Sequence, residues 1–249
     1  MPYLMKLRLQ DDQVAALPRD VGRALHALVY QWFALGDYSL SVDVHDHQGA
    51  RPFTVALVYS NHQPVLRVTL LDDTLEPALT YGIQVTKELE LLNHTLTLPK
   101  SGPSITKQPH ADLLTQARPD TRIGLRFLSP TSFRSREMHY PLPDPVMVFQ
   151  SWLNRWNEFA PEEYQINVAL LDIVAAHVAV SRYSGRTELV DFGANKRVVG
   201  FTGFVQYSVI RSHKIGEEWL RKLNALADYA VFCGTGHKTA QGMGVTERE

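Results

Sequence analysis

The order of strand-like and helix-like segments constrains this sequence most, because the same order occurs twice. A strand alternates apolar and polar side chains with a period of two, whereas an amphipathic helix repeats its apolar residues about every 3.6 positions. By this criterion each half of the 249-residue chain runs β-α-β-β-α-β. That order is typical of the ferredoxin-like motif. We therefore expect an α+β chain with two tandem ferredoxin-like (βαββαβ) domains.

The first predicted domain covers residues 1–103. Asp20 is the expected N-cap of the first helix, and residues 39–52 connect this helix to the next strand. The second helix contains Pro77, which a helix tolerates only in its first turn. The predicted elements are a strand over 3–10, a helix over 21–33, a strand hairpin over 53–60 and 64–71, a helix over 74–84 and a strand over 87–98.

The second predicted domain covers residues 104–249, and the Pro- and Ser-rich segment 99–119 contains the boundary. Asp144 and Pro145 predict the start of a helix, as N-cap and first helical residue. The predicted elements are a strand over 121–133, a helix over 143–159, a long hairpin over 173–185 and 197–210, a helix over 216–232 and a final glycine-rich segment. Trp152 and Trp156 are expected in the core.

Composition places limits on the compartment and the partners. The single cysteine, Cys233, excludes an internal disulfide and fits a reducing compartment. No segment approaches the roughly 20 apolar residues of a membrane span, and the start does not resemble a signal peptide. We expect a cytoplasmic protein without a membrane partner. The net charge of −1 argues weakly against nucleic-acid binding, but the distribution of charge matters more than its total.

The glycine-rich segment is "GTGHKTAQGMG", in which Gly234, Gly236, Gly242 and Gly244 surround Lys238. It is not a Walker P-loop, because His237 separates glycine from lysine, and it does not open a βαβ unit as a dinucleotide fingerprint does. Glycines allow a backbone to approach a partner closely, and successive N–H groups can bind an anion. An ordinary turn is the alternative interpretation.

This segment resembles the glycine-rich loop of the CRISPR-associated endoribonucleases that cut precursor CRISPR RNA, the Cas6 family. Further resemblances occur, in the same order as in the family, in the segments "LVYQW" (28–32), "VHDHQGARPFTVAL" (44–57), "FLSPTSF" (127–133), "VMVFQSWLNRW" (146–156) and "GFTGFVQYSV" (200–209). The resemblance implies two ferredoxin-like, RRM-like domains. It also implies metal-independent RNA cleavage without a cofactor, in which the 2′-OH attacks the phosphate and leaves a 2′,3′-cyclic phosphate and a 5′-OH.

The resemblance assigns three catalytic residues. His45 is expected to transfer a proton to the leaving oxygen, Tyr30 to orient or deprotonate the 2′-OH, and Arg51 to hold the phosphate. His47 and His26 are further catalytic candidates. Two departures from the family pattern are the arginine at position 51, where lysine is frequent, and Ala56, where serine is frequent.

The residues expected to bind RNA are Gly234, Gly236, His237, Lys238, Gly242, Gly244, Arg134 and Arg136. The expected partner is CRISPR repeat RNA or crRNA, with other subunits of a CRISPR effector complex as further candidates. Three alternatives stay open. His45 and His47 would point to one side of an extended segment, as a metal pair does; the chain could be a non-cleaving RNA-binding subunit on the same fold; or it could be a ferredoxin-like protein that binds a small molecule.

Overall fold

The computed structural model describes residues 1–9, 21–60, 63–92, 94–98, 101–193 and 196–249. The chain forms two compact units, and each is described by itself. Unit 1 comprises residues 1–107 together with 239–242, and unit 2 comprises residues 108–238 together with 243–249. The predicted boundary at residues 103 and 104 falls just before the last strand of unit 1. No helix among the described residues is long and apolar enough to cross a membrane.

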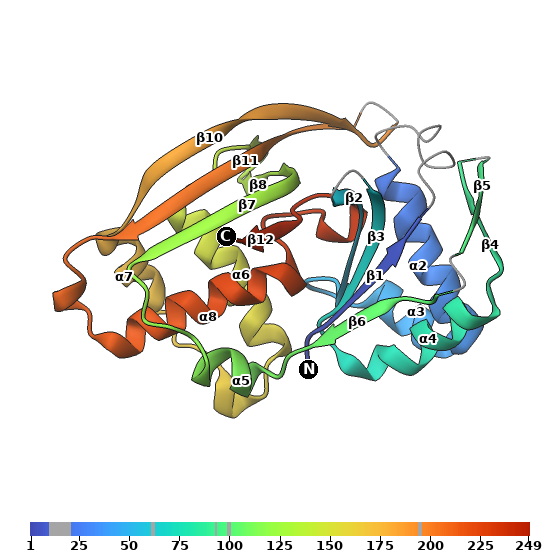
Figure 1. Cartoon of the computed structure of the whole chain (residues 1–249), viewed down its shortest axis with the longest axis horizontal. Coiled ribbons are helices and arrows are strands. Elements are labelled where there is room, and N and C mark those ends of the chain that lie inside the picture. Colours follow the sequence, from blue (N-terminus) through green and yellow to red (C-terminus); the bar gives the residue numbers. More distant parts are fainter. Residues whose placement is uncertain (10–20, 61–62, 93, 99–100, 194–195) are drawn as a thin grey trace. The chain divides into compact units, whose positions relative to one another are not determined.

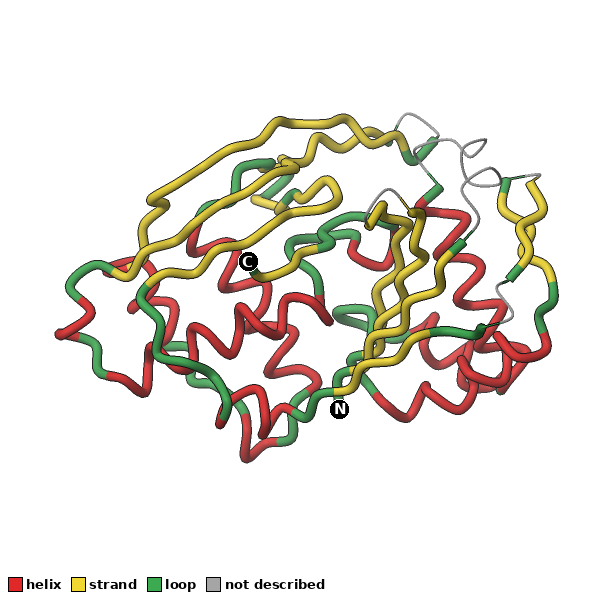
Figure 2. Tube along the Cα trace, in the orientation of Figure 1, coloured by secondary structure: helices red, strands yellow, loops and turns green. Residues whose placement is uncertain are grey.

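The central sheet of unit 1 has four antiparallel strands (Figures 1 and 2). Its spatial order is β2 (Phe53–Ser60), β3 (Gln63–Leu70), β1 (Tyr3–Arg8) and β6 (Ser104–Lys107). In chain order the strands are thus arranged 2-3-1-4. The predicted hairpin of β2 and β3 is confirmed, with Phe53 opposite Leu70 and Val58 opposite Val65.

Three helices share one apolar core with this sheet. They are α2 (Gly22–Gly36), α3 (Tyr38–Asp46) and α4 (Glu76–Val85), with the 3-10 turn η1 (Asp73–Leu75) before α4. Trp32 and Phe33 of α2 are fully buried. A Cβ at Gly82 of α4 would lie 2.2 Å from the Trp32 carbonyl oxygen, so only glycine lets the two helices approach this closely. Pro77 lies in the first turn of α4, as predicted.

Two expectations for unit 1 are wrong, and a third concerns a residue outside the described ranges. Residues 87–98 do not complete the sheet; they form the separate hairpin β4 (Glu88–Leu91) and β5 (His94–Thr97). The fourth strand is β6, which the sequence places in the linker. Residues 38–46 form helix α3 rather than a loop, with Asp37 as N-cap accepting from the Leu40 N–H. The predicted N-cap Asp20 lies outside the described residues.

Unit 2 repeats the topology. Its sheet order is β10 (Val178–Asp191), β11 (Arg197–Val209), β7 (Arg122–Thr131) and β12 (Thr246–Arg248), all antiparallel and again 2-3-1-4 in chain order (Figure 1). The two ferredoxin-like domains expected from the element order are therefore present.

The main helices of unit 2 are α6 (Pro145–Phe159) and α8 (Glu217–Cys233). The predicted cap of α6 is confirmed, because the Asp144 carboxylate accepts from the N–H groups of Val146 and Met147. Trp152 and Trp156 are fully buried core residues, as expected. Residues 173–177 belong to a helix and not to the predicted hairpin strand. The remaining elements are α5 (His110–Thr115), α7 (Leu170–His177), the hairpin β8 (Phe133–Ser135) and β9 (Met138–Tyr140), and the 3-10 turns η2 (Glu162–Tyr164), η3 (Ser212–Lys214) and η4 (Thr239–Gln241), of which η4 belongs to unit 1.

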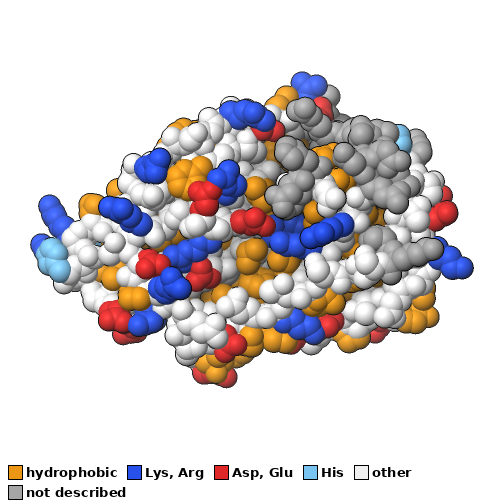
Figure 3. Space-filling view, viewed as in Figure 1, with side chains coloured by type: hydrophobic (Ala, Val, Ile, Leu, Met, Phe, Trp, Pro, Cys, Tyr) orange, Lys and Arg blue, Asp and Glu red, His pale blue; other side chains and the backbone are white. Residues whose placement is uncertain are grey.

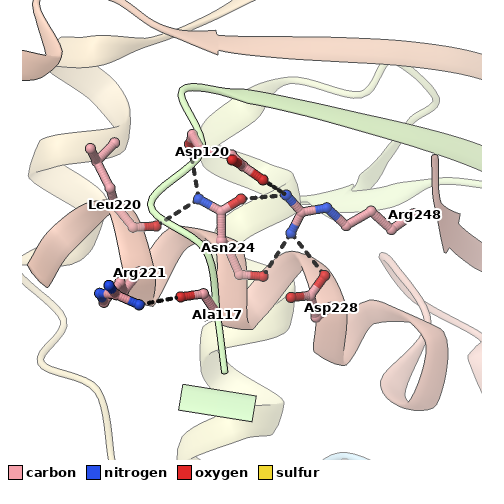
Figure 4. Close-up of polar contacts among 7 residues, drawn as sticks. All are labelled: Ala117, Asp120, Leu220, Arg221, Asn224, Asp228 and Arg248. Atoms are coloured by element: carbon pink, nitrogen blue, oxygen red, sulfur yellow. Dashed lines mark hydrogen bonds and ion pairs between the residues drawn. The ribbon is translucent and has the colours of Figure 1, made fainter. Parts of the chain in front are cut away.

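An arginine anchors the last strand of unit 2 (Figure 4). One amino group of Arg248 donates to the Asp228 carboxylate at 2.8 Å and to the Asn224 carbonyl at 3.2 Å. The other contacts the Asn224 side chain and lies 3.5 Å from the Asp120 carboxylate. Asn224 itself donates to the carbonyls of Asp120 and Leu220. These contacts hold β12 at the edge of the sheet, and with it the end of the glycine-rich segment.

Candidate functional site

The first cluster of candidate residues lies in unit 1, along one edge of helix α2. His26 and Tyr30 are one helical turn apart, and their rings are 4.9 Å apart in an edge-to-face arrangement. Both rings also contact Phe53 at the start of β2, with centroid separations of 5.6 Å for His26 and 5.5 Å for Tyr30. Phe53 is fully buried. The sheet therefore provides a rigid support for these two side chains.

His45 lies in the last turn of α3, beside Tyr30. The two ring centroids are 5.7 Å apart. The imidazole is largely exposed, and its Nδ1 lies 3.1 Å from the carboxylate of Asp46. Since α3 ends at Asp46 and His47 is its C-cap, the two histidines are not alternating residues of one extended segment, as the metal-pair alternative assumed. The described part of the chain contains no group of three or more His, Cys, Asp or Glu side chains placed to hold a metal ion.

Arg51 joins this cluster at the end of α3. One of its amino groups donates to the carbonyl oxygens of Val44 at 3.0 Å and His47 at 2.9 Å. A cation is favourable there because the carbonyl end of a helix carries partial negative charge. The hydroxyl of Tyr30 donates to the same Val44 carbonyl at 3.4 Å. One backbone oxygen therefore aligns Tyr30 and Arg51 beside His45.

Burial raises the pKa of Tyr30, and the positive charge of Arg51 opposes this shift only in part. A phenol must lose its proton to act as a base, and a raised pKa makes that loss less favourable at neutral pH. The environment of Tyr30 thus suits a hydrogen-bonding role better than proton abstraction.

Residues 239–242 of the glycine-rich segment belong to unit 1 and lie at the same edge of α2. His26 donates from Nδ1 to the Ala240 carbonyl at 2.9 Å. The N–H of Gly242 donates to the Val55 carbonyl of β2 at 3.0 Å. A Cβ at Gly22 would lie 2.0 Å from the Gln241 carbonyl oxygen. These contacts place His26 against the glycine-rich segment, where its ring nitrogen has a structural partner.

The glycine pattern itself has a local structural reason. Gly234, Gly236, Gly242 and Gly244 all have positive φ, between 66° and 89°. Glycine adopts this region without a steric cost. Their N–H groups are bonded within the protein: those of Gly234, Gly236 and Gly244 reach the Ala230 carbonyl, the Ser151 hydroxyl and the Pro130 carbonyl. The conformation of the turn itself therefore accounts for the glycines.

Helix α6 holds the part of this segment that belongs to unit 2. The indole N–H of Trp152 donates to the Thr235 hydroxyl at 2.8 Å. Arg155 donates to the Gly236 carbonyl at 2.6 Å, and Ser151 accepts from the Gly236 N–H at 3.2 Å. Residues 235 and 236 are thus fixed by three side chains from successive turns of one helix. The roles of Ser151 and Arg155 could not be predicted from the sequence, because polar residues in an amphipathic helix are usually solvated.

The side chains predicted to contact RNA in unit 2 fall into two groups. His237 stacks on His139, with ring centroids 4.9 Å apart and Nδ1 of His139 3.2 Å from Nε2 of His237. Arg134 and Arg136 are exposed in the β8–β9 hairpin, and Arg136 has a positive φ of 55° at its turn. In contrast, the ammonium group of Lys238 lies 4.2 Å from the centroid of the Phe192 ring, a cation–π contact within the protein.

Arginines also line the strands of the unit 2 sheet. Arg122 and Arg126 alternate along β7 with the buried Ile123, Leu125 and Phe127. Figure 3 shows Lys and Arg side chains, interrupted by acidic ones, over the area of β7, β10 and β11. Several are neutralised, for instance Arg126 by Glu249 and Arg186 by Glu188. The surface is mixed in charge and does not form a single basic stripe.

Comparisons with known proteins identify the family that this chain resembles. The family model described as CRISPR-associated endoribonuclease Cas6 matches residues 125–246. A CRISPR-associated endoribonuclease Cas6 from Streptococcus thermophilus is 22% identical over 210 residues, which is 82% of each chain. A second, from Mycobacterium tuberculosis, is 30% identical over 129 residues, 51% of this chain and 39% of that relative.

The solved structures that resemble this chain cover it from end to end. A Cas6 product complex is 26% identical with a TM-score of 0.82, and the match covers 100% of both chains. Cas6 from Thermus thermophilus is 24% identical with a TM-score of 0.75, covering 100% of this chain and 98% of that one. Together with the two ferredoxin-like sheets, these matches support the assignment of the chain to the Cas6 family of CRISPR-associated endoribonucleases.

Proposed function

We propose that this protein is a metal-independent endoribonuclease that cuts CRISPR repeat RNA within precursor crRNA. The similarity to Cas6 endoribonucleases supports RNA cleavage as the general activity. Among the related structures, one Cas6 protein was solved as a product complex and also as a substrate-mimic complex. The proposal includes a cytoplasmic location, and other subunits of a CRISPR effector complex as further partners.

The reaction is a transesterification at one phosphodiester. The 2′-oxygen of the ribose loses its proton and attacks the adjacent phosphorus, and the P–O5′ bond breaks. The products are a 2′,3′-cyclic phosphate and a 5′-OH, so one proton leaves the nucleophile and one reaches the leaving oxygen. Negative charge on the non-bridging oxygens rises between these events. A side chain that titrates near neutral pH and a fixed cation meet these requirements.

The single observation that carries this proposal is the cluster of His45, Tyr30 and Arg51 at the end of α3. His45 is exposed and can reach a substrate, so we assign it the proton transfer to the 5′-oxygen. Tyr30 hydrogen-bonds and orients the 2′-OH. Arg51 makes no further hydrogen bond to the described part of the chain beyond its two carbonyl acceptors, so its remaining N–H groups can bind the phosphate.

His26 and His47 are the secondary candidates. The Nδ1 of His26 is already engaged with the Ala240 carbonyl, so this nitrogen is not free to transfer a proton. His47 lies just beyond α3 and is exposed. In this proposal both support the site rather than transfer the proton.

The glycine-rich segment is proposed to bind RNA through its side chains. Gly234, Gly236, Gly242 and Gly244 shape the turn, and His237, with Arg134 and Arg136 of the neighbouring hairpin, contacts the RNA backbone. Lys238 adds charge while its ammonium group rests on Phe192. The division of labour proposed for the two domains follows: residues 1–103 carry the catalytic cluster, and residues 104–249 carry the binding loop.

The test uses a repeat RNA and the same RNA with one 2′-deoxy nucleotide immediately before the cut. Only the unmodified RNA should be cleaved, with and without EDTA, and the product should carry a cyclic phosphate. His45→Ala should lower the cleavage rate at least tenfold, since one proton-transfer group contributes about 10²–10⁴-fold, and should leave RNA affinity unchanged. His213→Ala is the matched control, because His213 is an exposed histidine in unit 2.

Two outcomes would contradict the proposal. Cleavage of the 2′-deoxy RNA would exclude attack by the 2′-OH. Tight binding of the repeat without any cleavage would favour the alternative of a non-cleaving RNA-binding subunit.

A further inference from the structure

Unit 2 contains a cavity of about 280 Å³ next to the start of the glycine-rich segment. It lies between helix α6, the first strand of the β8–β9 hairpin and residues 236–237. Its volume is near the lower limit of about 300–1,000 Å³ that is usual for small-molecule sites. It can therefore hold one small planar group and not a folded helix.

The inner wall of the cavity is apolar and rigid. Phe133 is 5% exposed, and Met147 of α6 is half-buried beside it. Gly236 forms part of the wall without a side chain, and its backbone is fixed on both sides by Ser151 and Arg155. An aromatic ring with a thioether provides favourable contact for a flat π-system. The wall thus suits the face of a nucleobase.

Two amides stand at the rim. Gln150 and Asn154 are four residues apart on α6, so they share one face of the helix, and both are exposed and line the cavity. Neither side chain makes a hydrogen bond to the described part of the chain. A side-chain amide offers a donor and an acceptor together, which matches the edge of a base.

The charge of the cavity favours an anion beside that base. Arg134 and His237 line it, and none of its lining residues, all within the described ranges, is acidic. Burial, together with the nearby His139, Lys238, Arg134 and Arg155, lowers the pKa of His237 to about 4. The imidazole is therefore neutral at pH 7 in surroundings that are otherwise positive.

We propose that this cavity binds a single unstacked purine nucleotide of the RNA substrate, with the base against Phe133 and Met147, its edge read by Gln150 and Asn154, and its phosphate beside Arg134 and His237. Asn and Gln side chains pair bidentately with the edge of adenine, which is why a purine fits better than a pyrimidine. Single-stranded bases splayed out of the stack are the elements that proteins read in RNA. The inference rests on the proposed RNA substrate and adds a sequence-reading element to it.

The experiment couples the two amides to one position of the RNA. Each nucleotide of a non-cleavable 2′-deoxy repeat RNA is replaced in turn by an abasic nucleotide, and the Kd is measured by fluorescence anisotropy at one fixed salt concentration. At one purine position the abasic change should weaken binding to the wild type about tenfold, since one stacked base contributes about 1–3 kcal/mol. The same change should have no effect on the variant Gln150→Ala/Asn154→Ala. Gln84→Ala, at an exposed position of α4, is the control and should behave as wild type.

The outcomes separate this inference from the proposed function. Coupling at one purine position supports it, whether or not the RNA is cleaved. Additive effects at every position, in a protein that cleaves the repeat normally, would overturn it. A second arm titrates free AMP, GMP, CMP and UMP into the wild type and the double variant. Binding of a free purine nucleotide that the double variant loses, without coupling in the RNA, would identify the ligand as a free nucleotide and overturn the assignment to RNA.

Discussion

Replacing Gly236 with alanine measures the effect of one close backbone approach in the glycine-rich segment. Gly236 has φ of +77°, and the new Cβ would lie 2.2 Å from the carbonyl oxygen of Ser132. Real Cβ atoms essentially never approach another atom within 3.0 Å, so one of the two backbones must move by about 0.8 Å. That movement disturbs the N–H···O=C bond from His237 to the same Ser132 carbonyl.

The expected loss of stability has two parts. A side chain in a backbone region reserved for glycine costs about 1–3 kcal/mol, and the forced displacement of packed atoms costs about 1–3 kcal/mol more. Gly216→Ala is the matched control: Gly216 has φ of +76°, and a Cβ there meets nothing within 4 Å. It should therefore show only the first part. The difference between the two variants, about 1–3 kcal/mol, is the cost of the close approach.

The assay is denaturant unfolding followed by tryptophan fluorescence. Three of the four tryptophans, Trp152, Trp156 and Trp219, are in unit 2, as are both glycines, so the signal reports the relevant unit. Gly236→Ala should lower the midpoint clearly more than Gly216→Ala at unchanged slope. Equal midpoints for the two variants would refute the reasoning from the Ser132 contact.

Three further changes test other features. Gly82→Ala on α4 should lower the free energy of unfolding by about 1–3 kcal/mol, because its Cβ meets the Trp32 backbone; unchanged stability by denaturant titration would contradict the helix contact. Burial raises the pKa of Asp228, so the folded state holds that proton more tightly than the unfolded state and stability decreases as pH rises above about 4. Asp228→Asn should remove this component from unfolding curves measured between pH 4 and 6, and an unchanged pH profile would count against it. His237 has the opposite sign: with its pKa lowered to about 4, the unfolded state takes up the proton first, so stability falls as pH drops from about 6.5 towards 4. In His237→Gln that part of the decrease should disappear from the melting temperature, and an identical decrease in the variant would contradict the shift.

Much of the architecture could be predicted from residue spacing. The strand pairs around Phe53 and Val205 are rich in β-branched and aromatic residues, and Asp144 with Pro145 marks a helix start, because these signals depend on local chemistry alone. The sheet edges could not be predicted. Strand β6 is short, with all four residues exposed, so its sequence resembles a linker, and only its pairing with β1 makes it a strand.

The candidate site was predictable in part. Resemblance to the family pointed to Tyr30, His45 and Arg51, and the structure brings them together at the end of α3. The sequence did not indicate helix α3, because this helix has a weak apolar stripe and only its Ser41 and Val44 are buried. The position of Gln150 and Asn154 at a cavity also could not be predicted, because the sequence does not distinguish a polar helix residue that faces solvent from one that faces a cavity.

The return of residues 239–242 to unit 1 has a practical consequence for dissecting the protein. A polypeptide truncated after Lys107 would lose the backbone donor to Val55 and the acceptor for His26, and it would leave the surface at Gly22 uncovered. An autonomous fragment of unit 1 would thus need residues 239–242 supplied in trans or grafted through a linker. Residues 239–242 are thus part of the fold of unit 1, although in the chain they follow most of unit 2.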